Sequence, residues 1–318
     1  EGARVGVIGT GSTAVQITSA VVGKARELRL FQRTPQWVLG IPNDPIDEAT
    51  RSMYRRDPDA MAAVRAELSE LFESNFANAV VDAHSPQMKM IEELCRANLD
   101  GTVTDPELRE RLRPNYRAAC KRLVISPDFY EAIQRPNAHL VTEPIAAVEP
   151  EGIRTTEGQL HELDVLVLAT GFRVDRFLRP IEVIGRDGIR LDDVWAQRPS
   201  AYLAVSIPHF PNLFMINGPN GPVGNFSLIE VAEAQFAYIQ QLIEAAEQRG
   251  CAEVGVTEEA AECFETARVE AARDTIWVTG CRSWYLDDRG IPSAWPWGFT
   301  RFREAMAKPV FEDYRFLP

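Results

Sequence analysis

Residues 4–14 read RVGVIGTGSTA, and this short stretch decides the fold of the first part of the chain. The apolar run at residues 5–8 predicts a buried β-strand, and residues 14–22 have the pattern of a helix. A second strand is expected at residues 28–31. A strand, a glycine turn, a helix and a second strand within about 30 residues form one βαβ unit, which is typical of dinucleotide-binding α/β folds.

The glycine turn follows the pattern GxGxx(G/A), and it stands between a strand and a helix, the context in which that pattern predicts a nucleotide site. Gly9 permits the tight turn, Gly11 lets the backbone approach a pyrophosphate, and Ala14 allows close packing of the helix on the strand. Free N–H groups at the start of the helix would face the phosphates. We therefore expect Gly9, Thr10, Gly11, Ser12, Thr13 and Ala14 to bind a dinucleotide, the alternative being a tight turn without a ligand.

The end of the second strand indicates which dinucleotide is bound. NAD-specific sites carry Asp or Glu there, about 20 residues beyond the turn, to bond the ribose hydroxyls. This sequence has Gln32-Arg33-Thr34-Pro35 instead. The guanidinium of Arg33 would attract a 2′-phosphate that a carboxylate would repel, and Thr34 adds a hydroxyl donor. NADPH is thus favoured over NADH, unless Arg33 is an ordinary solvated residue at a strand end.

The rest of the chain predicts an α/β protein of two domains. Residues of about 45–119 are charged, with apolar residues at helical spacing, and are interpreted as a helical insertion in an NADPH-binding domain of residues 1–172. Residues 152–161 predict a hairpin, and the apolar run at 164–169 predicts a parallel strand buried on both faces. Residues 173–318 would form a second domain.

Composition excludes several classes of function. The net charge is -12 and no dense run of Lys or Arg occurs, so a nucleic-acid partner is not expected. The four histidines and five cysteines lack metal-ligand spacing, so no metal site is expected. No apolar run reaches the ~18 residues of a membrane span, and no signal peptide precedes the first strand. The expected location is the cytoplasm.

Five ordered motifs together resemble one family, the class B flavoprotein monooxygenases, and within it the Baeyer–Villiger enzymes. The matching stretches are residues 5–16 with 31–35, Lys121-Arg122-Leu123 with 128–130, 164–172, 210–220 and 283–285. The resemblance implies a Rossmann-like NADPH-binding domain followed by part of a second, FAD-type dinucleotide-binding domain.

The resemblance also implies a reaction. NADPH reduces FAD, and the reduced flavin takes up O₂ to give a C4a-peroxyflavin. The peroxide then attacks a ketone, and an ester or lactone results. The expected cofactors are therefore NADPH and FAD, and the expected substrates are O₂ and a small organic ketone.

The same resemblance implies residue roles. Arg122 aligns with the catalytic arginine of the family, where a permanent cation stabilises negative charge on oxygen. Lys121 aligns with a second contact to the 2′-phosphate, and Trp284 with an aromatic residue near the nicotinamide. Gln16, Thr170 and Gly171 lie in matched cofactor-binding stretches. Taken without the resemblance, Lys121-Arg122 reads as a solvated helix face and Trp284 as a core residue.

The family opens with a separate FAD-binding GxGxxG, and the printed sequence has no second strand–GxGxxG–helix. We therefore expect a C-terminal portion of such an enzyme, which by itself binds little FAD and whose partner is the missing N-terminal segment. Alternatives are an enzyme that oxygenates N or S, and an NADPH-binding module without flavin. A flavin disulfide reductase is disfavoured because it needs a CxxC pair, which is absent.

Overall fold

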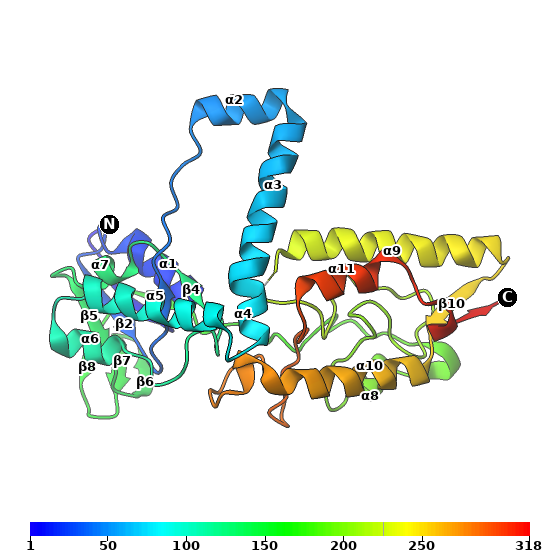
Figure 1. Cartoon of the computed structure of the whole chain (residues 1–318). Helices are drawn as coiled ribbons and strands as arrows, with labels where there is room; N and C mark the ends of the chain where they lie inside the picture. The colour runs from blue at the N-terminus through cyan, green and yellow to red at the C-terminus, as the bar shows by residue number, and fades with distance from the viewer. Residues whose placement is uncertain (225) are drawn as a thin grey trace. The chain divides into compact units, whose positions relative to one another are not determined.

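The computed structural model describes residues 1–224 and 226–318, which form two compact units (Figure 1). The first unit comprises residues 1–47 and 89–172, and the second comprises residues 48–88 and 173–318. The expected α/β class is confirmed, because the first unit is built on a parallel sheet flanked by helices.

The first unit contains a four-stranded sheet in the order β5-β2-β1-β9, with every neighbouring pair parallel. Its strands are β1 (Arg4–Ile8), β2 (Glu27–Phe31), β5 (Ala138–Val141) and β9 (Val165–Leu168). Helix α1 (Ser12–Val21) connects β1 to β2, as the glycine turn predicted. The βαβ unit is held by apolar burial, since Val7, Leu28 and Ala14 have no exposed surface.

The first unit contains further helices and short strands besides the four-stranded sheet. Asp105 caps the helix α6 by accepting hydrogen bonds from the N–H groups of Glu107 and Leu108, as the Asp-Pro pair predicts. The elements are β3 (Val38–Leu39), parallel to β4 (Val124–Ile125); α5 (Pro86–Thr102), which begins in the second unit; α6 (Pro106–Leu112); α7 (Phe129–Ile133); and an antiparallel sheet of β6 (Ile145–Glu149), β7 (Gly152–Thr155) and β8 (Leu160–Glu162). Strands β7 and β8 form the expected hairpin.

Strand β9 differs from the expectation of burial on both faces. It lies at the edge of the four-stranded sheet, and Val165 and Leu168 are 46% and 69% exposed. An apolar run reveals a strand but does not reveal its place in the sheet, because that place depends on pairing with distant segments. Arg4 anchors the strand: its backbone N–H and its guanidinium both bind Asp164, which lowers the pKa of that carboxyl to about 2.

The second unit is mostly helical and has its own core, which includes Tyr238, Leu242, Trp295 and Phe302. Its elements are α2 (Glu48–Arg56), α3 (Pro58–Phe72), the π-helix η1 (Glu73–Ala77), α4 (Asn78–Val81), η2 (Arg186–Gly188), α8 (Leu191–Val194), α9 (Leu228–Gln248), β10 (Glu253–Val256), α10 (Glu258–Ala271), η3 (Ala272–Asp274), η4 (Ile276–Val278), α11 (Phe299–Ala307), η5 (Phe311–Asp313) and β11 (Tyr314–Leu317), which is antiparallel to β10.

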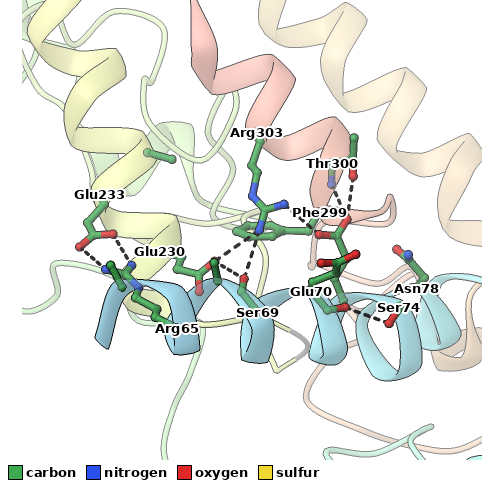
Figure 2. Close-up of a pocket in the computed structure, with 14 residues that line it drawn as sticks. Arg65, Ser69, Glu70, Ser74, Asn78, Glu230, Glu233, Phe299, Thr300 and Arg303 are labelled. Carbon is green, nitrogen blue, oxygen red and sulfur yellow. Dashed lines mark hydrogen bonds and ion pairs between the residues drawn. The ribbon is translucent and has the colours of Figure 1, made fainter. Parts of the chain in front are cut away.

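The expected helical insertion is divided, because residues 48–88 pack within the second unit. Figure 2 shows α3 and η1 joined to α9 and α11 by charged side chains. Arg65 on α3 lies 2.5 Å from Glu233 on α9, and Glu73 lies 2.9 Å from Arg303 on α11. Ser69 donates a 2.7 Å hydrogen bond to Glu230. These bonds cross long stretches of sequence, so the helical spacing by itself could not assign the segment to a unit.

The start of the glycine turn is fixed by a close backbone approach. Gly9 has a φ of +120°, a backbone conformation that residues with a side chain rarely adopt. A Cβ atom at this position would lie 2.2 Å from the carbonyl oxygen of Ala169. By contrast, Gly11 has an ordinary φ of -74°, and a Cβ atom there would meet no heavy atom within 4 Å.

We therefore expect Gly9→Ala to lower the free energy of unfolding by at least about 1–3 kcal/mol, from backbone strain and the clash with Ala169. Gly11→Ala is the matched control and should stay within about 0.5 kcal/mol of the starting protein. Urea denaturation followed by circular dichroism measures both. Equal stability of the two variants would contradict this account of the turn.

Candidate nucleotide-binding site

The glycine turn lies at the carboxyl edge of the parallel sheet, where parallel α/β folds bind ligands. Gly9 donates a 3.2 Å backbone hydrogen bond to Phe31 at the end of β2. Ala169, just beyond β9, donates a 2.9 Å bond to Ile8 at the end of β1. The ends of three neighbouring strands therefore meet at the turn.

The amino end of α1 fits an anionic group. Gly11 occupies the cap position without a side-chain hydrogen bond, and the first turn has no acidic residue. Gly11 and Thr13 are exposed and Ser12 is half-buried, so the unsatisfied N–H groups of the first turn can reach a ligand. Ala14 is fully buried, which explains the small residue at this position. Gln16 lies exposed on the same helix.

The segment after β2 is tied directly to the turn. The hydroxyl of Thr10 donates a 2.7 Å hydrogen bond to the carbonyl oxygen of Thr34. Arg33, its neighbour, is exposed. The residue that was expected to select the phosphorylated cofactor is thus held next to the glycine turn.

Lys121 reaches the same place from a distant part of the chain. Strands β3 and β4 are parallel, with Val38 opposite Val124, so the segments that precede them run side by side. Burial lowers the pKa of Lys121 below its usual value, and the charge of Arg33 lowers this pKa further. In the part of the chain that the structure describes, neither cation forms an ion pair with a carboxylate. Two neighbouring cations without a counter-ion favour the binding of a phosphate group.

Tyr116 completes this corner. It was not among the residues expected from the sequence, because it lies in the stretch interpreted as a helical insertion. Its hydroxyl lies 2.8 Å from the carbonyl oxygen of Pro35 and 2.9 Å from the side-chain oxygen of Gln36. Its ring lies beneath the ammonium of Lys121, with 4.7 Å between Nζ and the ring centroid. Tyr116 therefore holds both cation-bearing segments.

The remaining predicted residues are placed as follows. Arg122 is exposed and lies in an irregular segment before β4, so it does not belong to a helix face. Thr170 and Gly171 follow β9 and are exposed. Trp284 belongs to the second unit, is 41% exposed, and has its ring centroid 4.1 Å from that of Tyr285.

Within residues 1–224 and 226–318, no group of three or more His, Cys, Asp or Glu side chains is arranged to hold a metal ion. No helix in that range has both the length and the apolar character needed to cross a bilayer.

Known proteins resemble this chain over nearly its whole length. It is 44% identical over 313 residues to a monooxygenase of Mycobacterium tuberculosis, covering 98% of this chain and 63% of that protein. It is 34% identical over 308 residues to a Baeyer–Villiger monooxygenase of Pseudomonas aeruginosa, covering 95% of this chain and 58% of that protein. No family model matches the sequence.

Crystal structures of cyclohexanone monooxygenase match the fold. The enzyme of Rhodococcus sp. Phi1 bound to NADP⁺ gives a TM-score of 0.83 at 28% identity, and a closed form gives 0.82 at 30% identity. Each match covers 99% of this chain and 67% of the other chain. This chain belongs to the Baeyer–Villiger type of flavin-dependent monooxygenases. It spans less than two thirds of the length of the two relatives named above.

The proximity of Arg33 and Lys121 can be tested through the pKa of Lys121. Because Arg33 lowers the pKa of Lys121, we expect Arg33→Ala to raise it. Heteronuclear NMR of lysine side chains, titrated with pH, measures the change. Arg122→Ala is the matched control, because Arg122 is not among the groups that shift Lys121. An unchanged Lys121 pKa in Arg33→Ala would show that the two cations do not share one site.

Proposed function

We propose that this chain supplies the NADPH site and a catalytic arginine of an NADPH- and FAD-dependent monooxygenase, which inserts one oxygen atom of O₂ into a ketone to give an ester or lactone. The observation that carries the proposal is the pair of cations, Arg33 and Lys121, beside the uncapped amino end of α1. The names of the related proteins support the reaction class.

In this proposal the first unit, residues 1–47 and 89–172, is the NADPH-binding domain. The N–H groups at Gly11 and Ser12 bind the pyrophosphate, and Arg33 and Lys121 bind the 2′-phosphate. Thr34, Gln16, Thr170 and Gly171 complete the cofactor contacts expected from the sequence, with Trp284 near the nicotinamide. Residues 173–318 belong to the FAD-type domain.

Bound FAD, once NADPH has reduced it, supplies the chemistry that activates O₂. Arg122 provides a permanent positive charge, and in the described residues its guanidinium has no carboxylate partner. An arginine free of a counter-ion can stabilise negative charge on oxygen without transferring a proton.

The partners proposed for the whole enzyme are a small organic ketone, O₂ and the N-terminal FAD-binding segment. The cytoplasmic location stays a prediction from the sequence.

Replacement of the strand-end arginine tests cofactor choice. Arg33→Ala should raise the dissociation constant for NADPH about 10- to 100-fold, since charge-assisted hydrogen bonds contribute about 1.5–3 kcal/mol. The dissociation constant for NADH, which lacks the 2′-phosphate, should change little. Isothermal titration calorimetry measures both. Arg26→Ala is the matched control, because Arg26 is exposed at the opposite end of the same strand. Equal losses for the two cofactors would remove the assignment.

Replacement of Arg122 tests the reaction. In the whole enzyme, in which this chain is joined to the N-terminal FAD-binding segment, Arg122→Ala should lower lactone formation from a cyclic ketone by about 10²- to 10³-fold while NADPH affinity is kept. Product analysis and NADPH oxidation, each with and without FAD, provide the measurement. Oxidation of a thioether but not of a ketone would support heteroatom oxygenation instead. NADPH binding with no FAD-dependent product would indicate a binding module.

A further inference from the structure

The second unit contains a groove of about 490 Å³ that plays no part in the proposed reaction. Helix α10 lines it with Ala260, Cys263, Phe264 and Ala267, whose spacing places them on one helix face. Helix α11 contributes residues one turn apart, Arg301 and Ala305. The volume lies within the range of small-molecule pockets.

One wall of the groove is aromatic. Tyr202, Phe264, Trp295 and Trp297 all line it. The ring centroids of Trp295 and Trp297 lie 4.7 Å apart, and those of Tyr202 and Phe264 lie 5.7 Å apart. Trp295 is only 1% exposed, so packing fixes the position of this wall.

The charge of the lining is negative. Glu259, Glu312 and Asp313 contribute three carboxylates against the single cation of Arg301. The hydroxyl of Tyr202 donates a 2.5 Å hydrogen bond to Asp313. Burial raises the pKa of Tyr202, and the hydrogen bond to Asp313 raises it further, so this hydroxyl stays a neutral donor. The groove therefore attracts positive charge.

Arg301 already places a cation on the aromatic wall. Its guanidinium carbon lies 4.1 Å from the ring centroid of Trp297, a cation–π contact. Within the described residues it forms no ion pair with a carboxylate, although three line the same groove. The side chain is exposed and makes no hydrogen bond in the part of the chain that the structure describes, so it can move away from Trp297.

We propose that this groove binds a small organic cation, an alkylammonium group, which takes the face of Trp297 that Arg301 covers. The aromatic wall supplies the cation–π surface, and Glu259, Glu312 and Asp313 supply long-range attraction. The guanidinium of Arg301 acts as a competitor from the same chain.

Choline is the probe, and the matched control ligand is the neutral alcohol in which a carbon atom replaces the nitrogen of choline. Choline should quench tryptophan fluorescence with a dissociation constant in the millimolar range, and the neutral alcohol should bind more weakly. Choline should also slow alkylation of Cys263, the exposed free thiol in the groove. Cys251 is a free thiol outside the groove, so its alkylation rate is the internal reference and should not change.

Two variants are expected to change the affinity for choline in opposite directions. Trp297→Leu should weaken choline binding, whereas Arg301→Ala should tighten it about threefold or more, because the competing cation is removed. Arg249→Ala is the control, since Arg249 makes a cation–π contact with Phe316, which does not line the groove. Equal binding of choline and the alcohol, no protection of Cys263, or weaker binding in Arg301→Ala would each overturn the proposal.

Discussion

At the carboxyl edge of the parallel sheet, the backbone of Gly9 passes so close to the carbonyl group of Ala169 that no side chain fits between them. This approach brings the end of β9 against the turn and lets α1 begin directly above the edge of the sheet. The uncapped N–H groups of α1 and the Thr10–Thr34 hydrogen bond belong to the same turn, and Arg33 lies next to Thr34 in the chain. A displaced turn would therefore separate these groups.

The two cations of the site differ from several other arginines of the chain, which are paired with carboxylates. Arg4 is paired with Asp164, for example, and Arg113 with Asp100. Arg33 and Lys121 have no such partner in the described residues, and burial, followed by repulsion from Arg33, lowers the pKa of Lys121. A bound phosphate would remove this repulsion, so the unfavourable charge pair in the free protein becomes a gain on binding.

The second unit also contains both a paired and an unpaired arginine. Arg303 is held by Glu73 and Glu230 and so serves to join η1 and α9 to α11. Arg301, on the same helix, has no carboxylate partner in the described residues and rests on Trp297 instead. Neighbouring arginines of one helix thus separate into a structural cation and a cation that a ligand can replace.

Local sequence determined the βαβ unit, the glycine turn and Arg33 at the strand end, because each depends on residues close together in the chain. It also determined that α3 is a helix, but it did not determine that α3 packs against α9 and α11. Leu68 and Leu71 on that helix are each 58% exposed, while Arg65, Ser69 and Glu73 make the contacts to α9 and α11. Hydrophobic periodicity predicts which helix face makes apolar contacts, so it cannot predict the packing partner of a helix that is held by ion pairs.

The family resemblance predicted Lys121 beside Arg33, but only the tertiary structure brought Tyr116 to them, because the parallel pairing of β3 with β4 brings together segments that are distant in sequence. The edge position of β9 also depends on contacts between distant segments. Its apolar residues specify a strand, but its place beside β1 is set by strand pairing and by the Arg4–Asp164 hydrogen bond. Local sequence thus fixed the chemistry of the glycine turn, and long-range pairing assembled the charged corner beside it.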